Sequence, residues 1–261
     1  MNEDRFVLLL DILGFKQMVA TTPLDVICSR VEQVLLNECE SWATGQKGRD
    51  FDTIHFSDTV LIYTQRVGAY QEWYDDLIYI GARICTRMLA DEIPVRGALS
   101  YGSFLVKRSG RHQVFLGQAL VDAHQKEEGG AFLGFKVTPA AWKPLHPAHT
   151  AGAGLKQMRR AIEQPDGCLL INPFTQFIGL DKRQLMFDIE HQFEHPEQSD
   201  NPWLKTELQA FKFITQVAKK YAEATGPTNQ IGVKYLNTVQ FLRDVLGDDL
   251  YGLAEALAER V

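Results

Sequence analysis

Two aspartates stand where their side chains could do chemistry. In FVLLLDILGF, residues 6–15, Asp11 follows five apolar residues that predict a strand buried on both faces. A carboxylate at the end of such a strand is costly unless another group compensates its charge. In IHFSDTVLIY, Asp58 lies in the predicted turn between two β-rich runs. If those strands pair with the strand of Asp11, both carboxylates lie at the same edge of the sheet.

Two like charges at one sheet edge favour a bound cation. Carboxylate oxygens are hard ligands, so the predicted ion is Mg²⁺ or Mn²⁺. The alternative interpretation is structural. In it, Asp11 caps a helix and Asp58 is an ordinary turn residue, because Asp is common in both settings. Spacing alone leaves both interpretations open.

The apolar pattern predicts the elements that would position these aspartates. A strand over 5–12 is followed by a long helix over 15–43, which Pro23 restarts. A hairpin is predicted over 51–63, a helix over 69–91 and a strand over 95–104. A strand that leads into a helix follows over 114–128, and a last strand over 131–139. This alternation predicts an α/β fold, an α+β sandwich with helices on one face of a mostly antiparallel sheet.

The sequence pattern after residue 140 no longer alternates between strands and helices. Residues 168–180 predict another strand or two, and the polar, proline-bearing stretch 191–203 predicts a linker or exposed loop. From 203 to 261 the pattern is that of amphipathic helices. We therefore predict a first domain over 1–190 and a C-terminal helical subdomain over 200–261.

Composition restricts the class of protein. Apolar residues make up 45% of the 261 positions and charged ones 23%, which is typical of a soluble globular chain. The formal charge of −6 argues against a nucleic-acid or anionic-membrane binder. Four cysteines without a CxxC pair predict buried thiols in a reducing cytoplasm. No apolar run approaches the roughly 20 residues that span a bilayer, so we expect a cytoplasmic protein without direct membrane insertion.

Four motifs in order resemble those of the class III nucleotidyl cyclases. DILGF is similar to the family's Asp-Ile-x-Gly-Phe signature, and FSDTVLIY to its Gly-Asp hairpin. RGALSYG resembles the Arg-Val-Gly-Ile-His-x-Gly strand, and GQALVDAHQ falls where the family has its Gly-Pro-Ala-Val-Asn helix. The ordered set lies between residue 5 and about residue 140, roughly half of the chain.

The resemblance implies a cyclase-like sheet with flanking helices and a two-metal reaction. It makes Asp11 and Asp58 the catalytic carboxylates that carry two Mn²⁺ or Mg²⁺ ions, with the Ile12 carbonyl as a further metal ligand. In the family these ions bind a nucleoside triphosphate and lower the pKa of its ribose 3′-hydroxyl. That hydroxyl then attacks the α-phosphorus and expels pyrophosphate. A metal would thus be the partner that Asp11 needs.

Three further residues are predicted to bind substrate. Gly14 and Phe15 are two of them, because a tight turn there can aim backbone N–H groups at the phosphates of the nucleotide. Arg96 begins its strand, from where it can reach the base or a phosphate. For Arg96 the alternative is a solvated structural arginine.

The sequence also departs from the family. Cyclases that use ATP read the purine with a Lys and an Asp, and the matching positions hold Ile54 and about Val114, which cannot hydrogen-bond a base. The family's transition-state Asn and Arg are missing too. In their places stand Val121 and Gln125 or, with a shift of one residue, Asp122 and Lys126.

Two interpretations explain these departures. In the first, the chain resembles the pyrimidine cyclases of bacterial anti-phage signalling, the Pycsar systems. Such a homodimer converts UTP or CTP to the cyclic monophosphate, which acts on a separate effector, and UTP is preferred here because cyclic UMP is the more usual product. In the second, the chain is an inactive nucleotide-binding or dimerisation module. Retention of both aspartates favours activity, because two crowded carboxylates destabilise a site that has no use for them. A divergent adenylate cyclase is a third option.

Overall fold

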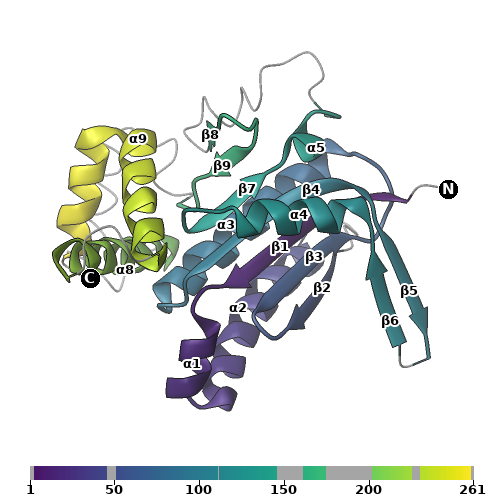
Figure 1. The fold of residues 1–261 in the computed structure, drawn as a ribbon, viewed down its shortest axis with the longest axis horizontal. Helices are drawn as coiled ribbons and strands as arrows, with labels where there is room; N and C mark the ends of the chain where they lie inside the picture. Colours follow the sequence, from purple (N-terminus) through teal and green to yellow (C-terminus); the bar gives the residue numbers. More distant parts are fainter. Residues whose placement is uncertain are drawn as a thin grey trace.

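The computed structural model describes residues 3–45, 51–110, 112–145, 161–174, 202–224 and 230–259. Its centre is a seven-stranded sheet in the order β2-β3-β1-β4-β7-β9-β8 (Figure 1). The strands are β1 (Asp4–Ile12), β2 (Phe51–Phe56), β3 (Thr59–Thr64), β4 (Val95–Ser103), β7 (Gly134–Val137), β8 (Ala161–Glu163) and β9 (Leu169–Ile171). Among these described strands only β4 and β7 pair in parallel. The predicted mixed α/β fold with a mostly antiparallel sheet is confirmed.

The helices lie in sequence between these strands and after them. They are α1 (Phe15–Thr21), α2 (Leu24–Gly45), α3 (Gln71–Ala90), α4 (Gln118–Glu128), α5 (Pro139–Trp142), α8 (Pro202–Ala224) and α9 (Gln230–Ala258). The predicted restart at Pro23 is observed, since the Pro23 carbonyl accepts the first hydrogen bonds of α2, from Val26 and Ile27. A separate hairpin of β5 (Leu105–Ser109) and β6 (His112–Leu116) precedes α4 and projects from the sheet (Figure 1).

Helices cover both faces of the sheet, which differs from the expected single face. One face of β1 carries Phe6, Leu8 and Leu10, which share a hydrophobic cluster with residues of α2 and α3. The other face carries Val7 and Leu9, which pack with two alanines of α4, Ala119 and Ala123. Small side chains at this i, i+4 spacing let α4 lie close to the strands.

The C-terminal helices belong to a second hydrophobic cluster. In it, apolar residues of α8 and α9 pack with Leu89 of α3, with Leu170 of β9, and with Phe132, Leu133 and Phe174. The helical pattern predicted from residue 203 is confirmed for the described residues. The linker predicted before it lies outside the described residues, and the division at 190–200 stays a prediction.

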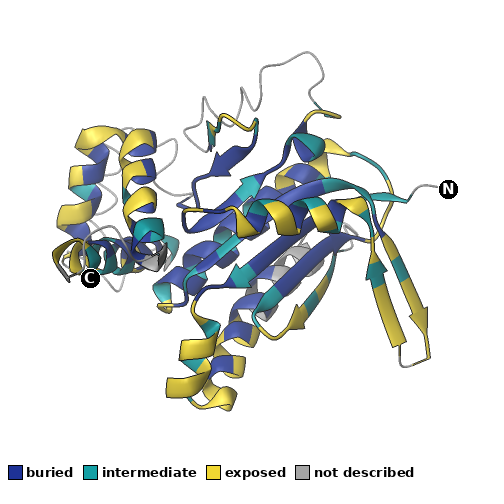
Figure 2. Ribbon diagram, in the orientation of Figure 1, coloured by how far each residue is buried: buried dark blue, intermediate teal, exposed yellow. Residues whose placement is uncertain are grey.

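Burial follows this layering. Figure 2 shows the central strands buried, while α1 and the β5–β6 hairpin are largely exposed. No helix in the described ranges is both long and apolar enough to cross a membrane.

Candidate active site

The structure brings Asp11 and Asp58 to one edge of the sheet. β1 and β3 are antiparallel, with Asp11 opposite Thr59, and the Ile12 N–H donates to the Asp58 carbonyl at 2.8 Å. Asp58 follows Ser57, whose φ of 57° turns the β2–β3 hairpin. Burial raises the pKa of Asp11, Arg96 opposes the shift, and the charge of Asp58 adds to it. The expected placement is therefore observed, while the catalytic and metal-binding roles of both residues stay predictions.

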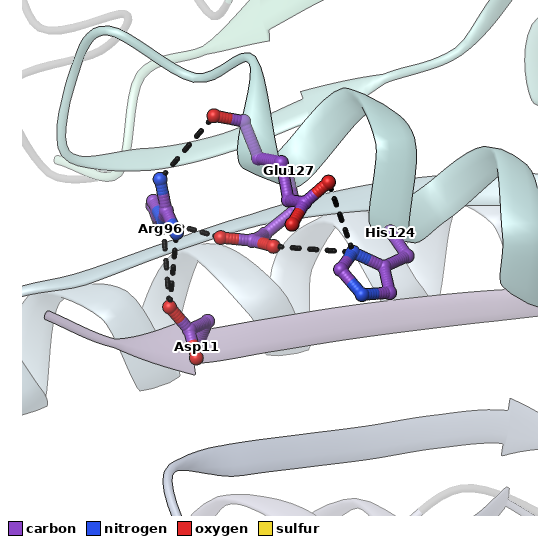
Figure 3. A network of polar contacts seen from close by, with 5 residues as sticks. Asp11, Arg96, His124 and Glu127 are labelled. Carbon is purple, nitrogen blue, oxygen red and sulfur yellow. Dashed lines mark hydrogen bonds and ion pairs between the residues drawn. The ribbon is translucent and has the colours of Figure 1, made fainter. Parts of the chain in front are cut away.

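Arg96 is the partner of Asp11 within the protein. It lies directly opposite Asp11 in the β1–β4 pair. Its Nη2 and Nε donate to Asp11 Oδ2 at 3.3 and 3.4 Å, and its Nη1 donates to the Glu128 carbonyl at 3.4 Å (Figure 3). The carboxylate at the end of the strand is thus compensated by a guanidinium on the neighbouring strand. Whether Arg96 also binds substrate stays a prediction.

Glu127 completes this network and was not singled out from the sequence. Its carboxylate forms an ion pair with Arg96 Nε, and its side chain is only 4% exposed. His124 lies one turn earlier on α4, with Nδ1 3.8 Å from Glu127 Oε2 (Figure 3). Burial raises the pKa of Glu127 to about 7, with Arg96 opposing and Asp11 adding to the shift. The available signal was its spacing, since Glu127 follows the buried Ala119 and Ala123 on the same helix face.

Gly14 and Phe15 have clear structural roles. Gly14 has a φ of 73°, in the left-handed region that glycine adopts without strain, and it precedes the first residue of α1. Its carbonyl accepts hydrogen bonds from the N–H groups of Gln17 and Met18. Phe15 is half-buried and packs against the main hydrophobic cluster. Their predicted contact with phosphates remains untested.

The residues at this edge offer the kind of ligand atoms that a hard cation binds. Asp11, Asp58 and the Ile12 carbonyl offer oxygen atoms, which Mg²⁺ and Mn²⁺ prefer. In the described ranges no group of three or more His, Cys, Asp or Glu side chains could hold a metal by itself. A bound ion would therefore need the backbone carbonyl and oxygens from a substrate in addition to the two carboxylates. It would also share Asp11 with Arg96.

The α4 positions that depart from the cyclase pattern do not face Asp11. Val121 and Gln125 are exposed on the outer side of the helix. Of the alternative pair, Asp122 accepts a hydrogen bond from Gln118 at 2.7 Å. Lys126 forms an ion pair with Asp166 at 2.9 Å. In neither register, therefore, does α4 offer its own chain's site a cation or an amide at these positions.

The two positions matched to purine recognition hold apolar side chains in different surroundings. Ile54 on β2 is half-buried and packs against the cluster that contains Val7 and Leu9. Val114 lies on the projecting hairpin and is 43% exposed. Neither position offers a hydrogen bond to a base.

A cleft of about 410 Å³ lies beside the network, between α9 and the segment that follows α4. Gly129, Phe132, Lys136, Asn237 and Phe241 are among the residues that line it. Asp11, Asp58 and Arg96 do not line it, so this cleft is distinct from the carboxylate site.

Comparison with known proteins finds likeness only among solved structures, since no family model and no curated protein matches the chain. One is the monomeric guanylyl cyclase domain of the RhoGC fusion protein from the aquatic fungus Blastocladiella emersonii, with 12% identity over 65% of this chain and 95% of that one, and a TM-score of 0.48. Another is the guanylate cyclase domain of RhGC from Catenaria anguillulae in complex with GTP, with 13% identity over 64% and 93% of the two chains and a TM-score of 0.45.

A third is the adenylyl cyclase CyaB from P. aeruginosa, with 14% identity over 56% of this chain and 81% of that one, and a TM-score of 0.42. The structures that this chain is similar to are thus guanylyl and adenylyl cyclase domains. At TM-scores below 0.5 these likenesses carry no weight for function, which has to be inferred from the site residues.

Proposed function

We propose that this protein is a nucleotide cyclase, which converts a nucleoside triphosphate into the 3′,5′-cyclic monophosphate and pyrophosphate. The observation that carries the proposal is the meeting of Asp11 and Asp58 at one sheet edge, where the Ile12 N–H binds the Asp58 carbonyl at 2.8 Å. Asp11, Asp58 and the Ile12 carbonyl would hold two Mn²⁺ or Mg²⁺ ions. When bound, these ions supply the charge that activates the 3′-hydroxyl and stabilises the phosphoryl oxygens.

The other residues of the site would position the substrate. Gly14 shapes the turn before α1, so that backbone N–H groups near Phe15 can meet phosphate oxygens. Arg96 orients the Asp11 carboxylate through two of its nitrogens and offers a guanidinium to an incoming phosphate. Placing the ribose hydroxyl and the α-phosphorus in line is a large part of catalysis in phosphoryl transfer.

The proposed substrate is a pyrimidine nucleotide, UTP in preference to CTP. Its support is the absence of purine-reading side chains at the matched positions, where Ile54 and Val114 stand. The choice of uracil follows the more usual product of the pyrimidine cyclases that the motifs resemble. By the same resemblance we propose a cytoplasmic homodimer of anti-phage defence whose cyclic product acts on a separate effector. The exposed apolar residues of the β5–β6 hairpin, Leu105 and Leu116, support a surface covered by a second copy.

One assay tests the reaction and the base together. Purified protein is incubated separately with UTP, CTP, ATP and GTP and with Mn²⁺ or Mg²⁺, pyrophosphate release is followed, and the product is identified by mass spectrometry. A cyclic product from UTP or CTP is the expected result. Product from ATP alone would eliminate the pyrimidine assignment and leave an adenylate cyclase. No product from any of the four would contradict the cyclase assignment.

A second candidate function is a nucleotide-binding or dimerisation module without catalysis. It is favoured by α4, where Val121 and Gln125 replace the transition-state residues and point outward. This candidate predicts that calorimetry detects triphosphate binding while the assay detects no product. Turnover that depends on Asp11 and Asp58 would exclude it.

A further inference from the structure

The C-terminal helix α9 is anchored beside the carboxylate network. Asn237 Nδ2 donates to the Ala131 carbonyl at 2.8 Å, and the Leu133 N–H donates to Thr238 Oγ1 at 2.8 Å. The Thr238 side chain is fully buried. Because Ala131 and Leu133 lie a few residues after the end of α4, these bonds hold one face of α9 against the segment that follows Glu128.

Lys234 lies on the same face of α9, one turn before these anchors. Its spacing of three and four residues from Asn237 and Thr238 places the three residues on one side of the helix. Thr238 Oγ1 also donates to the Lys234 carbonyl at 2.7 Å, so the turn that carries Lys234 is itself fixed. From there the half-buried Lys234 lies within range of the charges of Arg96, Glu127 and Asp11.

Arg96 reaches the start of the same segment, because its Nη1 donates to the Glu128 carbonyl at 3.4 Å, so the two cations lie on either side of the turn that follows α4. In the described ranges, Lys234 takes no part in the ion pairs that join Arg96 to Asp11 and to Glu127. Burial and the nearby Arg96 lower the pKa of Lys234, with Glu127 and Asp11 opposing the shift. A lysine next to an arginine in a partly buried site is stabilised by an anion that can accept hydrogen bonds from both. A chain of phosphates has that chemistry.

We propose that Lys234 is a substrate-binding residue whose ammonium group, together with Arg96, binds the phosphates of the nucleoside triphosphate. The proposal rests on the proposed function, because it names a further residue of that same site. It makes α9 a part of the active site and gives the C-terminal helices a role beyond bracing the fold. The competing explanation is that Lys234 only balances the charges of Asp11 and Glu127.

Kinetics separate these explanations. Lys234→Met keeps the length of the side chain and removes its charge, and we expect the KM for the triphosphate to rise roughly 10-fold or more, since charge-assisted bonds to phosphate are among the strong ones. Lys234→Arg should recover part of the loss. Lys219→Met, an exposed lysine of α8, is the matched control and should leave KM unchanged. A charge-balancing role would lower thermal stability in Lys234→Met without a change in KM, and that result would overturn the proposal.

A binding measurement makes the test independent of turnover. Inorganic tripolyphosphate is titrated by calorimetry, with Mn²⁺ present, into the full chain carrying Lys234, Lys234→Met or Lys219→Met. Weaker binding by Lys234→Met alone supports the phosphate role, even if no triphosphate is cyclised and the proposed function fails. Equal binding by all three proteins, or no binding by the unsubstituted chain, overturns the role of Lys234. In that case, normal cyclic product would show that the cyclase assignment stands without it.

Discussion

Arg96 and Asp11 face each other across the β1–β4 pair, and two nitrogens of the guanidinium lie 3.3 and 3.4 Å from one carboxylate oxygen. A second carboxylate, that of Glu127, binds the same guanidinium from α4. Arg96 therefore ties a central strand, its neighbour and the helix that covers them into one charged network. Such a network fixes the direction of the Asp11 side chain before any ligand arrives, which is the preorganisation that the proposed reaction would require.

Replacing either aspartate by asparagine should abolish product. Asp11→Asn and Asp58→Asn keep the shape of the side chain and remove the negative charge on which a divalent ion depends. We expect pyrophosphate release to fall below detection while circular dichroism shows an intact fold. Asp91→Asn, at an exposed position after α3, is the control and should turn over normally. Normal turnover by either site variant would refute the assignment of these two residues.

Glu127 should make stability depend on pH. Its pKa is raised from 4.5 to about 7, so the folded state holds a proton that the unfolded state releases between those values. The stability from this group is fully present below about pH 4.5 and is lost as the pH rises to about 7. The loss in the free energy of unfolding is at most about 3 kcal/mol, because each unit of pKa difference corresponds to about 1.36 kcal/mol.

Urea denaturation at a series of pH values checks this prediction. Glu127→Gln has no proton to lose, so the difference in the free energy of unfolding between it and the unsubstituted protein should change across that interval and stay constant above it. A difference that does not vary with pH would show that Glu127 is ionised throughout.

Two glycine substitutions should act in opposite directions. A Cβ at position 97, near the start of β4, would lie 2.2 Å from the backbone oxygen of Leu9, so Gly97→Ala should lower the free energy of unfolding by about 3 kcal/mol. Gly252 lies exposed in α9 with nothing near its missing Cβ, so Gly252→Ala should raise it by about 0.5–1 kcal/mol. Thermal denaturation measures both, and a tolerated Gly97→Ala would contradict the close strand pairing.

A buried acid should couple three helices. Glu38 of α2 is 1% exposed and forms ion pairs with Arg83 and Arg87 of α3, and Arg83 stacks 3.4 Å from the ring centroid of Trp203 on α8. Glu38→Gln should therefore destabilise the protein by about 3 kcal/mol, because two arginines lose a buried partner. Glu32→Gln, exposed on the same helix, should have little effect in the same denaturation experiment. Equal stability of the two variants would show that the cluster contributes little.

Much of the fold could be predicted because its signals are local. The apolar run before Asp11, the two β-rich runs on either side of the turn at Asp58 and the proline at position 23 each act within a few residues, and the structure places the elements where these signals indicate. The position of α4 on the second face of the sheet could not be predicted in the same way. Nothing in the sequence of α4 by itself tells which side of the strands its alanines cover.

Of the site, only the two aspartates that strand pairing brings together could be predicted from the sequence. Asp11 and Asp58 are joined by the pairing of neighbouring strands, which the order of the elements suggests. The partner of Asp11 depends on the register between β1 and β4, which puts Arg96 opposite it. Glu127 and Lys234 reach the network only through the docking of α4 and α9. Lys234 is more than two hundred positions from Asp11 in the chain, so tertiary packing alone decides their proximity.

The shared packing of α8 and α9 with Leu89, Leu170 and Phe174 has a practical consequence. A shortened version that stops near residue 200 would leave those side chains facing water, and it should aggregate rather than behave as an isolated domain. Loss of activity on truncation would therefore reveal nothing about chemistry. Single substitutions on the inner face of α9 are the informative way to dissect this end of the molecule.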